Sequence, residues 1–331
     1  MLISILLPVY NAASYLPECL NSIIAQQEQE WELLAVDDYS TDQSWQILES
    51  YASKDERIHI FKNTSKGIIP ALRLAFANST GELITRMDAD DRMAANKLDR
   101  LKAALMESGK GHIATNLVAY FSDQHLGEGY KKYAAWLNQL TTEVRNFEEI
   151  YKECVIPSPS WMIYRSDLQA IGGFNPNRYP EDYDLCFRWY AQQLKVIGIP
   201  EVLHYWRDHS TRTSRNDPTY ADNRFLDLKM EYFLKLDYQS DKTLVLWGAG
   251  KKGKAIAKIL VAQNIPFRWI CNQKSKWGHQ IHGVVLENTE NLTSILSPQI
   301  IVAVANPDTQ QEIRKFFREN GISKQDFFFF C

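Results

Sequence analysis

Residues 83–91 of the chain read LITRMDADD. The apolar start is typical of a buried strand, and three carboxylates follow it at once, on Asp88, Asp90 and Asp91. Like charges crowded at a strand end repel one another unless a cation lies among them, and Mg²⁺ is often held by such carboxylates together with substrate phosphates. The stretch therefore suggests a metal–diphosphate site. On these residues alone a solvated acidic turn stays an open alternative.

The composition is that of an ordinary globular enzyme. The chain has 331 residues, a length that favours about two domains, and it is 45% hydrophobic. Its net charge of −3 gives no general reason to expect nucleic-acid binding. The apolar residues 1–8 are interpreted as a first strand rather than a signal peptide, and no apolar run reaches the ~18 residues of a membrane span. Five scattered cysteines without a CxxC pair favour a reducing compartment. We expect a cytoplasmic protein, and peripheral attachment to the inner face of the membrane stays open.

Apolar runs alternate with amphipathic helical patterns in the first third of the chain. Strands are expected at 2–9, 31–36, 58–61 and 83–87, and helices at 13–26, 43–52, 68–77 and around 98–105. This alternation predicts a parallel sheet covered on both faces, in which ligands bind beyond the carboxyl ends of the strands. Asn11, Asp38 and the acids at 88–91 all follow predicted strand ends. We therefore expect them at one edge of the sheet, which favours the metal site over the acidic turn.

The middle of the chain is less regular. Its pattern predicts strands at 113–120, 161–164 and 202–206, a loop at 127–133 and helices at 143–153 and 222–236. A second acidic cluster, Glu181-Asp182-Tyr183-Asp184, opens a helical run over 185–192. Negative charge favours a helix N-terminus, but simple capping explains one or two acids better than three. The loop at 207–214 is polar and basic.

A glycine-rich turn begins the C-terminal part. A strand at 244–247 runs into Gly248-Ala249-Gly250-Lys251-Lys252-Gly253 and a helix at 254–263, which satisfies the dinucleotide fingerprint. The acid expected after the next strand is missing, because Cys271-Asn272-Gln273 stands there. Three interpretations stay open: NAD binding, a phosphate held by the lysines and the helix N-terminus, and a structural or oligomerising module. The sequence favours the last, which includes a homo-oligomer formed through this domain.

The N-terminal ~215 residues resemble family 2 glycosyltransferases, which are inverting enzymes of the GT-A fold. The resemblance rests on short motifs in the family's order. They are ILLPVYN at 5–11, VDDYSTD at 36–42, Gly81-Glu82 ahead of MDADD at 87–91, Gly172-Gly173-Phe174, EDYDL at 181–185 and YWRDH at 205–209. It implies an α/β protein with a GT-A nucleotide-diphospho-sugar transferase fold at 1–215, built on a mixed, mainly parallel sheet. A helical connector at 216–241 and a small Rossmann-like α/β domain at 242–331 would follow.

The resemblance also implies roles for residues of this chain. Pro8, Tyr10 and Asn11 would line the nucleotide pocket, and Asp38 would accept a hydrogen bond from the base, typically from uracil N3–H. Asp88 and Asp90 would serve the ribose and a Mg²⁺ or Mn²⁺ ion, with Asp90 or Asp91 as the direct ligand. His209 would complete the metal–diphosphate site or close over it. Asp182 would be the catalytic base.

The sequence departs from the family pattern at several places. Tyr39 replaces the usual glycine, Trp206-Arg207 shifts the usual Tyr-Arg step by one position, and Arg73 stands where many relatives carry asparagine. Arg73 would reach the diphosphate or be structural. Arg207 and Arg212 would hold phosphate or be ordinary solvated charges.

The chemistry of these residues is coherent. A metal stabilises the diphosphate that leaves, while a carboxylate away from the metal takes the proton of the attacking hydroxyl. We expect transfer of a single sugar from a nucleotide sugar, UDP-linked by preference, to a glycan or lipid-linked acceptor in cell-surface polysaccharide synthesis. The alternatives are a sugar nucleotidyltransferase, whose glycine-rich, arginine-containing first loop is absent, and a regulatory nucleotide-sugar-binding protein with the C-terminal domain as its output module.

Overall fold

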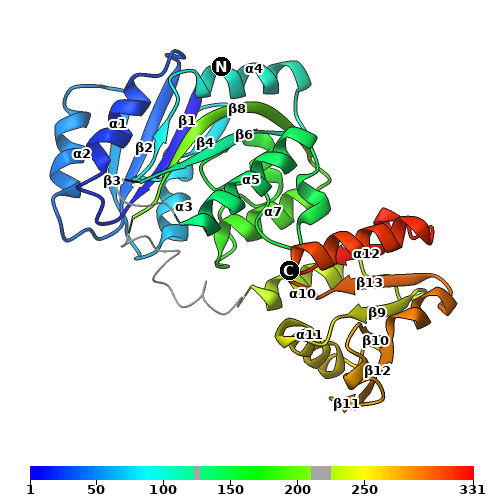
Figure 1. The fold of residues 1–331 in the computed structure, drawn as a ribbon. Coiled ribbons are helices and arrows are strands. Elements are labelled where there is room, and N and C mark those ends of the chain that lie inside the picture. The colour runs from blue at the N-terminus through cyan, green and yellow to red at the C-terminus, as the bar shows by residue number, and fades with distance from the viewer. Residues whose placement is uncertain (123–126, 210–224) are drawn as a thin grey trace. The chain divides into compact units, whose positions relative to one another are not determined.

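The structure, a computed structural model, describes residues 1–122, 127–209 and 225–331. Within them a mixed sheet of eight strands, in the order β3-β2-β1-β4-β7-β6-β8-β5, organises the N-terminal unit (Figure 1). Its strands are β1 (Ile3–Val9), β2 (Trp31–Asp37), β3 (Ile58–Lys62), β4 (Leu83–Arg86), β5 (Arg92–Met93), β6 (His112–Phe121), β7 (Trp161–Tyr164) and β8 (Lys195–Arg207). β3, β2, β1 and β4 are parallel, whereas β7 is antiparallel to β4 and β6. The expected mixed α/β sheet is confirmed.

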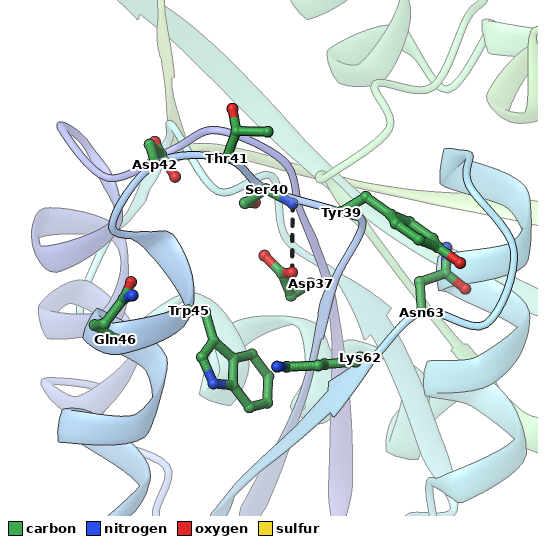
Figure 2. Close-up of a pocket in the computed structure, with 9 residues that line it drawn as sticks. All are labelled: Asp37, Tyr39, Ser40, Thr41, Asp42, Trp45, Gln46, Lys62 and Asn63. Atoms are coloured by element: carbon green, nitrogen blue, oxygen red, sulfur yellow. Dashed lines mark hydrogen bonds between the residues drawn. The ribbon is translucent and has the colours of Figure 1, made fainter.

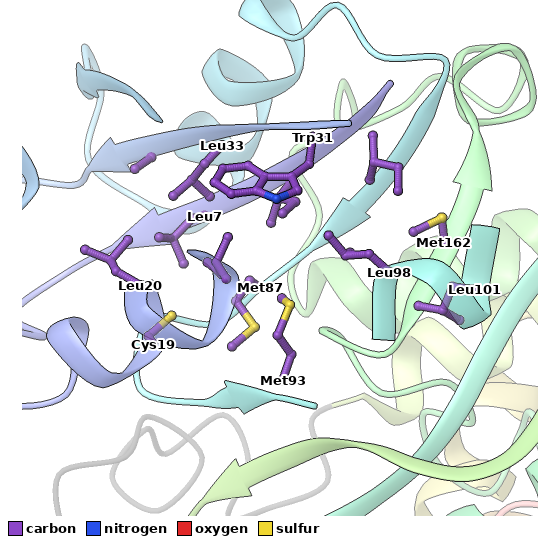
Figure 3. Packing of buried hydrophobic residues seen from close by; sticks show 14 of the residues in the cluster. Leu7, Cys19, Leu20, Trp31, Leu33, Met87, Met93, Leu98, Leu101 and Met162 are labelled. Atoms are coloured by element: carbon purple, nitrogen blue, oxygen red, sulfur yellow. The ribbon is translucent and has the colours of Figure 1, made fainter. Parts of the chain in front are cut away.

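Helices cover both faces of this sheet. They are α1 (Leu16–Ile24), α2 (Ser44–Ala52), α3 (Ile68–Asn78), α4 (Lys97–Ser108), α5 (Glu128–Glu143), α6 (Arg165–Ala170) and α7 (Glu181–Ala191). α1, α2 and α4 bury one face, where Leu20 and Leu98 pack around Trp31 and Met87 (Figure 3). α3 packs against β1 and β2 and contributes nothing to that cluster, so it covers the opposite face. Burial on both faces explains why these strands are continuous apolar runs.

The loops after β1, β2 and β4 meet at one edge of the sheet. The strands are in parallel register, with Val9 beside Asp37 and Leu6 beside Arg86. Asp38 donates its backbone N–H to the carbonyl of Val9 at 2.7 Å, and Met87 donates its own to Leu6 at 3.0 Å. The predicted convergence of Asn11, Asp38 and the acidic run at this edge is confirmed.

Two local predictions in the middle of the chain are wrong. Residues 128–143, expected to begin as a loop, form the helix α5, and the short helix expected at 143–153 is only a 3-10 turn at Asn146–Glu149. The buried residues with helical spacing, Ala134, Leu137 and Thr141, come only after the first turn of the helix. That first turn contains a glycine and charged residues, so the sequence pattern did not indicate where the helix begins. β8 begins at Lys195, well before the expected strand at 202–206.

Gly198 of β8 lies in close contact with α5. A Cβ atom there would be 1.9 Å from the carbonyl oxygen of Thr141. We expect Gly198→Ala to lower the free energy of unfolding by about 1–3 kcal/mol, because either the helix or the strand must move. Urea unfolding measures the change. Gly129→Ala in α5, whose Cβ would meet nothing within 4 Å, is the matched control and should be neutral or stabilising. Equal stability of the two variants would contradict the prediction.

The second unit is a smaller α/β sheet. Among the described residues its strand order is β11-β12-β10-β9-β13-β14, and all neighbours are parallel except β11 and β12. The strands are β9 (Thr243–Trp247), β10 (Arg268–Cys271), β11 (Gln280–Ile281), β12 (Val284–Asn288), β13 (Pro298–Val302) and β14 (Phe327–Phe329). The helices are α10 (Leu226–Leu236), α11 (Lys251–Ala262) and α12 (Pro307–Glu319). The parallel order with flanking helices is Rossmann-like, as expected.

The glycines of the fingerprint have packing roles in this unit. Gly248 has φ +118, and a Cβ there would be 2.8 Å from the carbonyl oxygen of Ala303. A Cβ at Gly253 would be 2.0 Å from the carbonyl oxygen of Gly248. Asn272, at the position of the missing acid, accepts a hydrogen bond from the Trp247 indole at 2.7 Å. These contacts account for two glycines without a ligand.

The second unit also includes a segment from the middle of the chain. The unit comprises Glu148–Cys154 together with Asp217–Cys331, whereas residues 148–154 were expected to lie within the first domain, 1–215. The Tyr151 ring stacks on Phe330, with centroids 5.2 Å apart, and its hydroxyl donates to Asp237. Glu149 pairs with Arg314 of α12. The segment is thus held by aromatic packing and by ion pairing.

The helices in the described part of the chain are each too short or too polar to cross a membrane. All five cysteines, every one of which the structure describes, are free of disulfides. Three of them, Cys19, Cys186 and Cys271, are buried. They behave as small core side chains, in keeping with their scattered positions in the sequence.

Candidate active site

The loop after β2 presents the predicted base-binding carboxylate. Asp38 is 7% exposed, and its Oδ1 accepts hydrogen bonds from the Asn63 amide at 2.7 Å and from the Gly67 backbone N–H at 2.8 Å. Gly67 also lies 2.9 Å from Oδ2. A carboxylate has about four acceptor sites, so capacity for a further donor remains. Tyr10, directly after β1, has a half-exposed ring, and the Lys66 ammonium lies 5.1 Å from the centroid of that ring.

The loops after β1 and β2 are tied together by side chains. Asn11 has φ 48 and accepts a hydrogen bond from the Thr41 N–H at 2.8 Å, while its own N–H donates to the Ser40 hydroxyl at 3.0 Å. Tyr39 has φ 63, a left-handed conformation that glycine adopts without strain. This explains why the family pattern has glycine there. Pro8, the remaining predicted pocket residue of this strand, pairs with Val36 of β2.

A hollow of about 420 Å³ lies beside the loop after β2 (Figure 2). Tyr39, Trp45 and Lys62 line it, and the Lys62 ammonium is 4.6 Å from the Trp45 ring centroid. Asp37 also faces it and accepts a long hydrogen bond, 3.4 Å, from the Ser40 N–H. Asp38 and Tyr10 do not line the hollow, so it is distinct from the predicted base-binding residues.

The acidic run after β4 divides into an accessible and a buried carboxylate. Asp90 Oδ2 lies 2.9 Å from His209 Nε2, and both side chains are partly exposed. The His209 ring packs on Tyr15, with centroids 4.7 Å apart. Asp91 is 1% exposed, and its two oxygens lie 2.9 Å from His204 Nε2 and 2.7 Å from the Arg207 backbone nitrogen. The structure therefore brings the predicted metal residues Asp90 and His209 together, while Asp91 faces inward.

A buried lysine and a buried histidine, both absent from the sequence analysis, support this loop. Lys97 and His204 are fully buried, and Lys97 Nζ lies 3.1 Å from His204 Nδ1. Burial lowers the pKa of Lys97 to about 7, although Asp91 opposes the shift. Arg207 donates from Nε to the carbonyl of Asp90 at 2.8 Å and pairs with Glu18. Arg207, for which phosphate binding was one of the two expected roles, thus holds the acidic loop through contacts within the protein.

Asp88, the first carboxylate of the acidic run, is joined through Arg86 to the second acidic cluster. It accepts hydrogen bonds from Arg86, whose Nη2 is 3.0 Å and whose Nε is 3.2 Å from Asp88 Oδ1. Arg86 Nη1 donates to Glu181 Oε1 at 2.8 Å. One arginine therefore connects the end of β4 with the first turn of α7. The sequence contained a signal for it, since Arg86 is a lone cation at the end of a buried apolar strand.

Asp182, the predicted base, lies in that first turn of α7. Its Oδ1 accepts a hydrogen bond from the Tyr183 N–H at 2.7 Å. Burial is the largest cause that raises the pKa of Asp182, to about 7, and the charge of Glu181 adds to it while Arg86 opposes it. A carboxylate with a pKa near neutrality suits a proton acceptor, because it is both sufficiently basic and deprotonated at working pH.

Two further arginines, Arg73 and Arg212, were predicted as possible phosphate-binding residues, and the structure describes only Arg73. Arg73 of α3 donates to the backbone carbonyls of Phe174, at 3.2 Å, and Asn175, at 2.9 Å. Its guanidinium thus holds the Gly172-Gly173-Phe174 turn, which fits the structural alternative for Arg73. Arg212 lies outside the described residues.

The residues at the edge of the sheet fit a divalent cation held partly by a substrate. Within residues 1–122, 127–209 and 225–331, three or more Asp, Glu, His or Cys side chains are nowhere grouped as a complete metal site. Asp90 and His209 nevertheless offer a carboxylate and an imidazole 2.9 Å apart. Mg²⁺ and related ions are commonly bound by one or two protein groups plus substrate phosphates. The donor set matches that mode rather than an all-protein cage.

Known proteins are similar to this chain in sequence. The Glycosyl transferase family 2 model matches residues 4–172, roughly half of the chain. The putative teichuronic acid biosynthesis glycosyltransferase TuaG of Bacillus subtilis is 34% identical over 217 residues, which cover 65% of this chain and 82% of that protein. Glycosyltransferase GlyG of Streptococcus pneumoniae is 26% identical over 226 residues, covering 65% and 74%.

Solved structures agree on the fold. S. aureus TarS in complex with UDP-GlcNAc superposes with a TM-score of 0.55 at 19% identity, covering 78% of this chain and 72% of that one. The mannosyltransferase PcManGT from Pyrobaculum calidifontis, in complex with GDP-Man and Mn²⁺, gives 0.52 at 20% identity over 70% and 63%. The first unit thus has the GT-A fold. The chain belongs to glycosyltransferase family 2.

Proposed function

We propose that this protein is a metal-dependent, inverting glycosyltransferase that moves a single sugar from a UDP-sugar to a glycan or lipid-linked acceptor in cell-surface polysaccharide synthesis. One observation carries the proposal. The carboxyl group of Asp182 has a pKa of about 7 and belongs to the first turn of α7, an element that contains neither Asp90 nor His209, which leaves it available as a base. The name of the relative TuaG supports the polysaccharide context.

The donor nucleotide binds along the loops after β1 and β2. Asp38 accepts a hydrogen bond from the base, and its contacts with Asn63 and Gly67 hold the carboxylate in place for that bond. Tyr10 presents an exposed aromatic ring, and Pro8 and Asn11 complete the pocket wall. The UDP-GlcNAc complex of TarS supports a uridine nucleotide as the donor. Because PcManGT is in complex with GDP-Man, a guanosine nucleotide is the alternative donor to be tested.

The diphosphate binds at the edge where Asp90 and His209 meet. These two side chains are the proposed ligands of Mg²⁺ or Mn²⁺, which when bound neutralises the charge that grows on the departing diphosphate. Asp91 stays a predicted ligand, and its contacts with His204 and Arg207 would have to open for it to reach the ion. Asp88 is proposed to contact the ribose while Arg86 holds its carboxylate.

Asp182 performs the proton transfer. Its carboxylate accepts the proton of the acceptor hydroxyl as that oxygen forms a bond to the anomeric carbon. The bond between the anomeric carbon and the diphosphate oxygen breaks in the same displacement, and the electron pair leaves with the nucleoside diphosphate. A single displacement inverts the anomeric configuration. The acceptor proton ends on Asp182 and is released to solvent as the product leaves.

A thermal-shift panel tests donor binding. UDP-glucose, UDP-galactose, UDP-GlcNAc, UDP and GDP-mannose are each added with Mn²⁺, with Mg²⁺ or with EDTA. We expect a rise in melting temperature with uridine nucleotides and a metal, because a ligand at 100 times its Kd stabilises the folded state by about 2.7 kcal/mol. Uridine alone is the control for the base. A shift with GDP-mannose and none with any uridine nucleotide would contradict the role given to Asp38.

A further inference from the structure

Arg86 is a buried cation placed between the two acidic clusters of the site. It is 4% exposed and lies at the end of β4, directly before the acidic run. Its guanidinium donates to Asp88 Oδ1 at 3.0 Å from Nη2 and to Glu181 Oε1 at 2.8 Å from Nη1. The bond to Glu181 spans 95 residues of sequence, and together the two bonds join the loop after β4 to the first turn of α7. The planar fork of arginine suits such a double contact, which lysine cannot reproduce.

We infer that Arg86 and Glu181 form a positioning pair for the transfer reaction, one that ties the donor-side carboxylate Asp88 to the helix start carrying Asp182 and sets the proton affinity of that base. The inference rests on the proposed function, because it concerns the base named there. Neither residue touches a reacting atom. Both act through Asp88 and Asp182.

The charges around Asp182 explain how the pair acts. Arg86 forms ion pairs with the carboxylates of Asp88 and Glu181, and its charge also acts on the carboxyl group of Asp182. The pKa of Asp182 is raised to about 7 as the net result of several causes: burial, the largest, raises it, Glu181 and Asp88 also raise it, and Arg86 together with the Tyr183 N–H lowers it. Although burial alone lowers the pKa of Arg86, Asp88 and Glu181 raise it overall, so the guanidinium stays protonated. Glu181 and Arg86 thus act in opposite directions on a base whose pKa is raised chiefly by burial.

The opposing charges predict shifts of opposite sign. In Glu181→Gln a neighbouring negative charge disappears, and the midpoint for Asp182 is expected to fall by about one pH unit. In Arg86→Met the neighbouring positive charge disappears, and the midpoint is expected to rise by about one unit. Arg86→Lys keeps the charge and should bring the midpoint closer to that of the wild type. An arginine that serves only to fill and stabilise the fold predicts no such pattern.

NMR of protein carrying ¹³Cγ-aspartate measures these midpoints on the full chain without any substrate. The resonance that is missing in Asp182→Asn assigns the base. Arg86→Met removes the ion-pair partner of buried Glu181 and of partly exposed Asp88 and is at risk of unfolding, whereas Glu181→Gln changes almost no volume and keeps the test valid. Arg165→Met is the matched control, since Arg165 donates to the Gly81 carbonyl and the Ser79 hydroxyl and faces no carboxylate of the site.

The outcomes separate this inference from the proposed function. A lowered midpoint in Glu181→Gln, a raised one in Arg86→Met and an unchanged one in Arg165→Met support the positioning pair. A midpoint unchanged by Glu181→Gln, in a protein whose Asp182→Asn variant is inactive, overturns the pair and leaves the base in place. Full turnover by Asp182→Asn instead overturns the base itself, whatever the midpoints.

Discussion

Asp182→Asn is expected to lower the rate of sugar transfer by about 10²–10⁴-fold, the contribution typical of a general base. Asparagine has nearly the same shape but cannot accept the proton of the acceptor hydroxyl. Binding of the nucleotide and the metal should persist, because Asp90, His209 and Asp38 are unchanged. Release of nucleoside diphosphate from the donor identified by the panel measures the rate, and the thermal shift with that donor measures binding.

The pH dependence of the wild type provides a second signature of the same residue. With a pKa of about 7, Asp182 becomes protonated as the pH falls below neutrality, so kcat/KM should drop tenfold per pH unit on the acid side. That limb should vanish from the residual activity of Asp182→Asn. The exposed Asp99, also an acid in the first turn of a helix, supplies the matched control Asp99→Asn, which should keep both rate and profile.

Loss of activity in Asp182→Asn should not come from unfolding. The pKa of Asp182 is about 7 in the folded chain and 3.8 in the unfolded chain, so the folded chain binds this proton more tightly. The free energy of unfolding contributed by this group is therefore largest below pH 3.8 and falls as the pH rises from 3.8 to about 7. At pH 8 the amide lacks the penalty of a buried charge, and its melting temperature should equal or exceed that of the wild type. Full turnover by the variant would contradict the role of Asp182 as the base, whereas donor binding without any transfer by the wild type would favour the regulatory nucleotide-sugar-binding alternative.

Asp90→Asn is expected to remove the metal-dependent part of nucleotide binding, weakening the affinity for UDP in Mn²⁺ by at least about 100-fold. The amide keeps the size of the side chain but lacks the negative charge that a divalent cation requires. In EDTA the variant and the wild type should bind UDP equally, because the base contacts at Asp38 are untouched. Isothermal titration calorimetry with and without Mn²⁺ makes the comparison.

A double-mutant cycle with His209→Ala sharpens this test. Asp90 and His209 lie 2.9 Å apart, so if they hold one ion the double variant should be little worse than either single variant. Asp99→Asn again serves as the control for loss of a carboxylate. Independent, additive losses would show that His209 acts elsewhere, and unchanged metal dependence in Asp90→Asn would remove this residue from the metal site.

The order of elements and the edge of the sheet could be predicted from the sequence because they depend on local patterns. The apolar runs at 2–9, 31–36 and 83–87 report strands that are buried on both faces, and parallel strands place their carboxyl ends together. α5 was not predicted because its first turn carries Gly129 and charged residues, and its apolar spacing begins only at Ala134.

The residues that support the site could not be predicted in the same way. Arg86, Lys97 and His204 are buried polar groups whose partners lie 95, 107 and 113 residues away in sequence, in Glu181, His204 and Asp91 respectively. Only the tertiary fold brings such partners together, and a single sequence gives no sign of which distant charge compensates which. The carboxylates themselves were visible because several of one sign were crowded together.

The route of the chain through residues 148–154 limits how this protein can be divided. Because that segment belongs to the second unit while its flanking residues belong to the first, a cut near residue 216 leaves Tyr151 without Phe330 and Glu149 without Arg314. An isolated C-terminal fragment lacks the same seven residues of its own core and ion pairs. The two units are thus interleaved along the gene, so a single recombination point cannot exchange one of them intact, and both parts of the second unit must be transplanted together.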